Sequence, residues 1–454
     1  MRDLLILFAL IFTLPMIFRR PYVGVVLWAW LSFISPEDYL YGFMQGAPLA
    51  KVVSGLTLFC MVISREKKNY YADKFTIAAI IFAILSISSC IFSDMTLIDP
   101  WDLCQRVLKI LVFCFVMQVL IRNQMRVHAV LIAISLGLGF HGALEGMKFL
   151  VTAGSYHTPG IGAFGDNNSF ALAIDMVIPI LMYLARHSVQ RIFKIGLTVV
   201  AGLSTFAVMS SFSRGGFIGL LIVGAGVVLS GQNKIRNGIY VGLMTAALLY
   251  AAPDTWYNRV DTIETADQDA SFLGRVVAWK ISTLAALDNP FLGVGFHSVQ
   301  DGGIWRKYSL HFDTLSFVPT DEPSEIPHAA HSIYFEVLGD LGFTGLILFG
   351  SILTLSFVNI GRIKRLARSY EGLEWAGNLA SALRVSLLAY AVAGAALSMA
   401  YFELFFIIAA ILSLVRRMIE HDLVPASRVK LAESPPPALR VRPLVGTPAR
   451  TGAV

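Results

Sequence analysis

Charged residues are scarce in this chain of 454 residues. Only 15% are Asp, Glu, Lys or Arg, whereas 56% are hydrophobic, and a soluble protein carries about 25% charged residues. Because about 20 apolar residues cross a membrane once, the hydrophobic share suffices for about a dozen helices. The composition therefore excludes a compact soluble enzyme and a disordered, collagen-like or disulfide-stapled chain. It predicts an all-α, polytopic integral membrane protein.

Cysteine is also rare. The four cysteines all lie in or beside apolar segments: Cys60, Cys90, Cys104 and Cys114. Because no C-x-x-C pair exists, we expect small core side chains rather than disulfides or zinc ligands. We expect no cleavable signal peptide, since the first apolar run ends in Arg19-Arg20-Pro21 rather than in small residues. The basic residues are scattered between apolar runs, so the net charge of +6 does not indicate nucleic-acid binding.

The apolar runs predict about twelve transmembrane helices, with residues 4–35 forming either a hairpin or a bent pair. The runs fall roughly at 4–18, 21–35, 49–63, 75–93, 103–121, 127–150, 168–185, 192–212, 216–230, 236–252, 332–360, 379–399 and 402–415. The connections between them alternate in charge. By the positive-inside rule, connections rich in Lys and Arg are cytoplasmic and the acidic connections between them lie outside.

Four regions follow from this topology. Residues 1–252 form an N-terminal bundle, and residues 332–415 form the C-terminal transmembrane helices. The long connection 253–331 holds 11 acidic and five basic residues, lies on the outer face, and contains the amphipathic stretch Leu273–Leu287. Since long loops are usually functional, we expect a large, partly helical subdomain there. Residues 416–454, rich in basic residues and proline, read as a disordered cytoplasmic tail.

Arg214 is a candidate functional residue, because charges at the edge of apolar segments are costly. It lies between two apolar runs, in Ser213-Arg214-Gly215-Gly216, on the outer side, where the positive-inside rule does not place arginine. A guanidinium beside glycines can bind an anion, most naturally a phosphate. The alternative is an arginine that caps a helix or reaches the lipid headgroups.

His331 and Ser332 open the membrane helix that follows the long loop. A histidine there can act as a base near neutral pH, or it can simply belong to a helix cap. Metal binding by His328 and His331 is a further alternative, although the spacing fixes no third ligand. Glu336 lies about 140° around the helix from His331, so it is not an obvious direct partner.

Two further residues are candidates in turns on the outer face. Arg275 lies in the acidic loop, where it can also be an ordinary surface arginine paired with Asp267 or Asp269. The turn Asp166-Asn167-Asn168 can hydrogen-bond a sugar or cap the next helix.

These motifs resemble those of one superfamily over about residues 160–345. They are Ser213-Arg214-Gly215-Gly216, Gly274-Arg275-x-x-x-Trp279, Asn289-Pro290-x-x-Gly293-x-Gly295 and His331-Ser332. In this order they resemble the O-antigen ligase/polymerase superfamily. The chain is most similar to an O-antigen ligase (the WaaL type) or to the O-glycosylation ligases close to it.

The resemblance implies a GT-C-like glycosyltransferase of the bacterial inner membrane, active on the periplasmic side in lipopolysaccharide biosynthesis. Its donor is a glycan on undecaprenyl diphosphate, and its acceptor is a sugar hydroxyl of lipid A–core. The family's functional arginines correspond to Arg214 and Arg275, and its catalytic histidine to His331. The remaining candidate substrate-binding residues are Asn167, His328, Ser332 and Glu336.

The expected chemistry is metal-independent and inverting, without a cofactor. A diphosphate leaving group needs charge neutralisation, which two arginines can supply, and the acceptor hydroxyl needs a base. A polymerase or a protein O-glycosylation ligase of the same superfamily remains an alternative. A lipid or glycan transporter, with charged residues along a central path, is a third.

Overall fold

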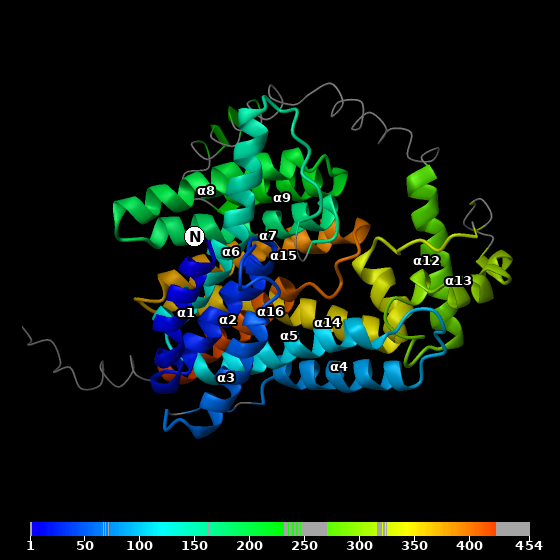
Figure 1. Ribbon diagram of the computed structural model, residues 1–454, viewed down its shortest axis with the longest axis horizontal. Helices are drawn as coiled ribbons and strands as arrows, with labels where there is room; N and C mark the ends of the chain where they lie inside the picture. The colour runs from blue at the N-terminus through cyan, green and yellow to red at the C-terminus, as the bar shows by residue number, and fades with distance from the viewer. Residues whose placement is uncertain are drawn as a thin grey trace, which may run out of the picture.

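The computed structural model describes residues 2–423, apart from positions 67, 69, 71, 162–163, 231–234, 236–237, 240–241, 244–245, 247–269, 316–319, 321–322 and 324. The described residues form helices and their connections, with no strand among them beyond one isolated bridge, Ile161–Phe164 (Figure 1). The predicted all-α class is therefore confirmed for this part of the chain.

The helices of the first half begin and end within a few residues of the predicted apolar runs. They are α1 (Arg2–Arg19), α2 (Tyr22–Ile34), α3 (Leu49–Ile63), α4 (Lys74–Ile91), α5 (Trp101–Leu120), α6 (Gln124–Val151), α7 (Asn167–His187), α8 (Arg191–Ser210) and α9 (Arg214–Ser230). α1 and α2 are separate helices that contact each other. The side chains of Asp73, Asn123 and Asp166 cap α4, α6 and α7 by accepting backbone N–H bonds.

The second half contains the described helices of the predicted outer-face loop and the C-terminal helices. They are α12 (Ala270–Asp288), α13 (Gly302–Ser309), α14 (Ile333–Ser369), α15 (Glu374–Ala393) and α16 (Glu403–Met418). α12 covers the predicted amphipathic stretch. A π-helical turn, Ile419–Leu423, continues α16 past residue 415. The apolar run 236–252, for the most part, and tail residues 424–454 lie outside the described residues.

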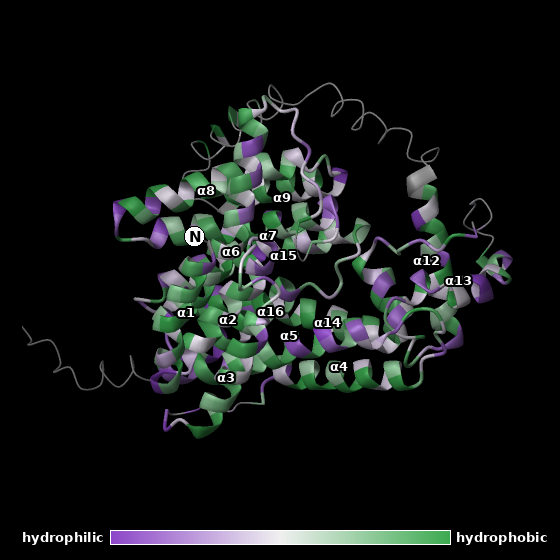
Figure 2. Cartoon of the chain, in the orientation of Figure 1, coloured by the Kyte–Doolittle hydropathy of each residue, from purple (hydrophilic) through white to green (hydrophobic). Residues whose placement is uncertain are grey.

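Seven of the described helices are long and apolar enough to cross a membrane, namely α4, α5, α6, α7, α8, α14 and α15. Shorter apolar helices include α2, α3 and α9. Figure 2 shows hydrophobic residues along these helices, with hydrophilic residues concentrated at their ends and around α12 and α13. These findings support a polytopic membrane protein, whereas about twelve spans and a GT-C-like arrangement stay predictions.

α7 forms the centre of the bundle. Almost every residue from Ser169 to Ala185 is buried, because α6, α8, α9 and α15 all pack against this helix (Figure 1). α16 occupies a similar position between α5 and α14. The four cysteines are buried and unpaired, which confirms the prediction that they are core side chains.

α14 is broken near its start, at Gly342. This residue has φ +67°, a conformation that strains a residue with a side chain. The N–H of Phe343 donates to the carbonyl oxygen of Pro290 at 2.9 Å, and a Cβ on Gly342 would lie 2.6 Å from the same oxygen. The Asn289–Gly295 turn therefore packs directly against the break and fixes the direction of the first turns of α14.

α12 and α13 form a small unit at one end of the bundle (Figure 1). It has a hydrophobic core of its own, which includes Ile281, Trp305 and Tyr308. Asp301 caps α13 and also accepts N–H bonds from Leu97 and Ile98 at 2.8 and 3.0 Å. This carboxylate thereby connects the unit to the α4–α5 connection, on the side where the outer face was predicted.

Candidate active site

Arg214 is the first residue of α9 and follows a tight turn. Phe212 adopts φ +52° in this turn, and the N–H of Gly216 donates to Ser213 Oγ at 3.1 Å, which caps the helix. A Cβ on Gly216 would lie 2.5 Å from that of Ala171 in α7. The Ser-Arg-Gly-Gly sequence therefore places a half-buried guanidinium at a helix start packed closely on α7.

Asn167, at the start of α7, supports this turn. Its Nδ2 atom donates to the carbonyl oxygen of Ser211 at 2.6 Å. The preceding Asp166 accepts N–H bonds from the first turn of α7 at 2.8 and 3.0 Å. Asp166 therefore caps α7, as one of the two alternatives for this turn predicted. The Asn167 side chain instead links α7 to the turn that carries Arg214.

Arg275 lies in α12 and is half-buried. Its Nη1 atom donates to the carbonyl oxygen of Ala396 at 3.3 Å. One turn further, Trp279 Nε1 donates to the carbonyl oxygen of Ala330 at 2.6 Å, and its ring stacks on Phe335 with centroids 5.0 Å apart. The Gly-Arg-x-x-x-Trp motif thus joins α12 to the start of α14. Asp267 and Asp269, the partners in the surface alternative, lie outside the described residues.

His331 lies two residues before α14, as predicted. It has φ +43°, and its N–H donates to Ser398 Oγ at 2.9 Å. Ser332 takes the N-cap position and is buried, yet its hydroxyl makes no capping hydrogen bond. A backbone held in a sparsely populated conformation is a feature that clusters at active sites.

The charges around His331 affect its protonation. Burial lowers the pKa of the His331 imidazole, and the nearby guanidinium of Arg275 lowers it further. Asp166 acts in the opposite direction, and His328 contributes a smaller lowering. The ring is therefore neutral at neutral pH and can accept a proton.

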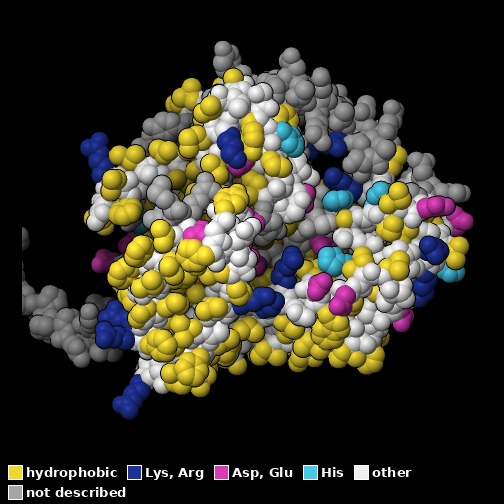
Figure 3. All heavy atoms as spheres, in the orientation of Figure 1, with side chains coloured by type: hydrophobic (Ala, Val, Ile, Leu, Met, Phe, Trp, Pro, Cys, Tyr) yellow, Lys and Arg dark blue, Asp and Glu magenta, His cyan; other side chains and the backbone are white. Residues whose placement is uncertain are grey.

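One irregular segment, residues 394–402, connects the predicted residues. Besides the contacts of Ala396 and Ser398 described above, Leu397 lies against Gly215, with 3.6 Å from its side chain to an added Cβ. The 394–402 segment therefore contacts α9, α12 and the His331 turn. Figure 3 shows charged and histidine side chains gathered in the middle of this face, between the helices around α7–α9 and those around α5 and α14.

Acidic residues of α14 hold the 394–402 segment in place. Glu336 Oε2 accepts the N–H of Ala400 at 3.0 Å, and Asp340 Oδ2 accepts the hydroxyl of Tyr401 at 3.0 Å. Glu336 thus acts on the segment rather than directly on His331.

His328 is exposed, with its ring centroid 5.7 Å from that of Trp305. Within the described ranges, no group of three or more His, Cys, Asp or Glu side chains is placed to hold a metal ion.

The 394–402 segment is the main feature that the sequence analysis missed. The apolar run 379–399 was predicted to be continuous, whereas α15 ends at Ala393. The signal was the small-residue sequence Gly394-Ala395-Ala396, which hydropathy alone reads as membrane helix. The influence of Asp166 on His331 was also missed, because 165 residues separate them in the chain.

Comparison with known families gives two matches along the chain. Residues 199–350 match a family model described as O-antigen ligase, and this stretch contains Arg214, Arg275 and His331. Residues 1–189 match a family of unknown function, DUF5935. No curated protein matches the chain. The first match supports the O-antigen ligase/polymerase superfamily and a transferase activity of the ligase or polymerase type.

Proposed function

We propose that this protein is an O-antigen ligase that acts on the periplasmic face of the bacterial inner membrane. It transfers a glycan from undecaprenyl diphosphate to a sugar hydroxyl of lipid A–core. The observation that carries the proposal is the junction formed by the 394–402 segment. It contacts Gly215, the neighbour of Arg214, together with the Arg275 side chain and the His331 backbone, which come from three elements distant in the chain.

The two arginines bind the diphosphate of the donor. Each guanidinium offers several donors in a planar fork that matches phosphate oxygens. As the bond between the anomeric carbon and the diphosphate oxygen breaks, negative charge grows on the leaving group. The arginines stabilise this charge without a proton or a metal ion.

His331 is the general base. The neutral imidazole takes the proton of the acceptor hydroxyl while the hydroxyl oxygen forms the new bond to the anomeric carbon. One base and one displacement from the face opposite the leaving group give inversion at that carbon. Asn167 supports the turn that carries Arg214, and Glu336 supports the 394–402 segment. Ser332 and His328 are candidates for contact with the substrates.

A reconstituted assay tests the proposal. Purified protein in detergent is given an undecaprenyl-diphosphate-linked glycan and rough lipopolysaccharide, with and without excess chelator. We expect glycan-bearing lipid A–core in both conditions. A ladder of glycan repeats on the carrier would instead identify a polymerase, and a glycosylated protein acceptor would identify an O-glycosylation ligase.

A further inference from the structure

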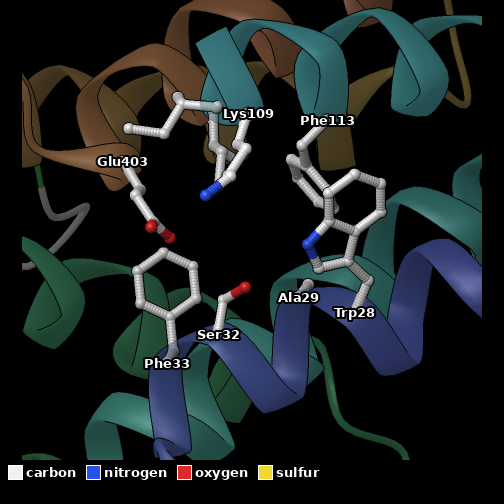
Figure 4. A pocket seen from close by; sticks show the side chains of 9 residues that line it. Trp28, Ala29, Ser32, Phe33, Lys109, Phe113 and Glu403 are labelled. Atoms are coloured by element: carbon white, nitrogen blue, oxygen red, sulfur yellow. The ribbon is translucent and has the colours of Figure 1, made fainter. Parts of the chain in front are cut away.

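A polar cavity lies between α2, α5 and α16, and none of its lining residues belongs to the Arg275–His331 site. Figure 4 shows four polar groups that point into it: the ammonium of Lys109, the carboxylate of Glu403, the hydroxyl of Ser32 and the indole nitrogen of Trp28. The aromatic rings of Phe33 and Phe113 complete the lining. Polar groups that converge in a largely apolar pocket indicate a ligand site.

The charged groups of this cavity make no hydrogen bond or ion pair with another described residue. The same holds for Ser32, and Glu403 has longer-range interactions with Arg106 and Cys114. An unpaired charge that is withdrawn from water in a membrane protein is costly and is a functional candidate. This applies to the half-buried Glu403, whereas Lys109 faces it from an exposed position. An opposed but unpaired Lys109 and Glu403 therefore point to a ligand with complementary charges.

The face of α5 beside the cavity is amphiphilic along its length. Arg106 and Lys109 are exposed near the outer end of the helix. They are followed inward by Val112 and Phe115, whose side chains are 41% and 42% exposed. α5 is long and apolar enough to cross a membrane. This order, cations first and apolar side chains deeper, suits a lipid with a phosphate head and an acyl chain.

The size and charge of the cavity narrow the class of lipid. Its volume of about 40 Å³ has room for about three water molecules, which suits an ammonium group. Glu403 and the aromatic rings attract a cation, whereas Arg106 and Lys109 attract an anion. A purely anionic head would meet the Glu403 carboxylate, so a head with both charges fits better.

We propose that this cavity binds a zwitterionic aminophospholipid of the outer leaflet. Its amine enters the cavity beside Glu403, and its phosphate rests on Arg106 and Lys109 at the mouth. The lipid lies at the far end of the 394–402 segment, because Phe402 packs on Phe33 with ring centroids 6.5 Å apart. A lipid bound in the cavity therefore stabilises the 394–402 segment, which also contacts the proposed active site.

Native mass spectrometry of the purified protein tests this site without any glycan-transfer assay. The protein is mixed with equal amounts of phosphatidylethanolamine and phosphatidylglycerol. We expect phosphatidylethanolamine to be retained about tenfold more, which corresponds to about 1.4 kcal/mol. Excess inorganic phosphate should not displace it, since the acyl chain contributes to binding. Equal retention of the two lipids, or displacement by phosphate alone, would overturn the proposal.

Matched variants test whether the lipid binds in this cavity. Glu403→Gln removes the partner of the amine and should shift the preference toward phosphatidylglycerol. Lys109→Gln should reduce retention of both lipids. Lys194→Gln, on the exposed first turn of α8, is the control and should bind lipid as the wild type does. If Glu403→Gln remains folded in a thermal scan and keeps the wild-type lipid preference, the cavity is not the site.

Discussion

The protonation of His331 is central to the proposed chemistry at the residue scale. A general base must be neutral before it can take a proton. Burial and Arg275 both lower the pKa of the imidazole, so the neutral form persists to a lower pH than for an ordinary histidine. The guanidinium that we propose binds the donor thus also helps to keep the proposed base neutral.

The pH profile of kcat/KM should reflect this arrangement. We expect transfer to rise with pH through an apparent pKa below the usual histidine value of about 6.5. Arg275→Gln removes a positive charge, so it should raise this apparent pKa while it slows the reaction. Asp166→Asn should lower the pKa, because it removes the opposing charge. If the midpoint of the pH profile in both variants equals that of the wild type, a group other than His331 is titrating.

Variants of Arg214 distinguish bidentate binding of the diphosphate from an effect of positive charge alone. Arg214→Lys retains the charge but loses the bidentate fork. We expect transfer to fall about 10–100-fold, the effect of losing one charge-assisted hydrogen bond, and to fall further in Arg214→Ala. Arg191→Lys, at the exposed start of α8, is the control. Wild-type turnover by a well-folded Arg214→Ala protein would contradict diphosphate binding. It would favour the alternative that this arginine caps a helix or reaches the lipid headgroups.

At the scale of elements, helices were predictable from the sequence and their interruptions were not. Apolar run lengths and capping residues such as Asp73 are local signals, so α3, for example, begins and ends where its run does. The 394–402 segment escaped prediction because Gly394-Ala395-Ala396 is as apolar as a helix. The segment is held by contacts with α12 and α14, and contacts between distant residues cannot be read from a local window of sequence.

The break in α14 is predicted to require glycine at position 342. Gly342→Ala introduces a side chain at φ +67° and against the Pro290 carbonyl. We expect the free energy of unfolding to fall by about 1–3 kcal/mol, measured as a lower midpoint in thermal unfolding in detergent. Gly350→Ala, in the same helix with no atom within 4 Å of the added Cβ, is the matched control. Equal midpoints for the two variants would contradict the role of the break.

At the scale of the whole molecule, the candidate site lies at the end of the bundle that carries α12 and α13 (Figure 1). The sequence predicted candidate site residues, because the motifs around Arg214, Arg275 and His331 are contiguous stretches. It could not predict the contacts that hold these motifs, since they join residues more than 60 positions apart, such as His331 and Ser398.

Cysteine accessibility tests the predicted orientation in the membrane. The four natural cysteines are buried, so they contribute little background labelling. We expect Asp313→Cys, next to α13 in the unit predicted to lie outside, to react with a membrane-impermeant maleimide in cells whose inner membrane is intact. Arg365→Cys, at the opposite end of α14, should react only after that membrane is permeabilised. Both side chains are exposed, so the reverse pattern would invert the topology.

The most direct test of the proposed function is the rate of glycan transfer by His331→Ala, measured together with donor binding on the same preparation. Loss of a general base costs about 10²–10⁴-fold in rate, whereas the arginines still hold the diphosphate. We therefore predict transfer slowed by that factor, an unchanged Kd for the lipid-linked donor, and a nearly normal rate in the neighbouring control His328→Ala. Transfer by His331→Ala at the wild-type rate would contradict its assignment as the base.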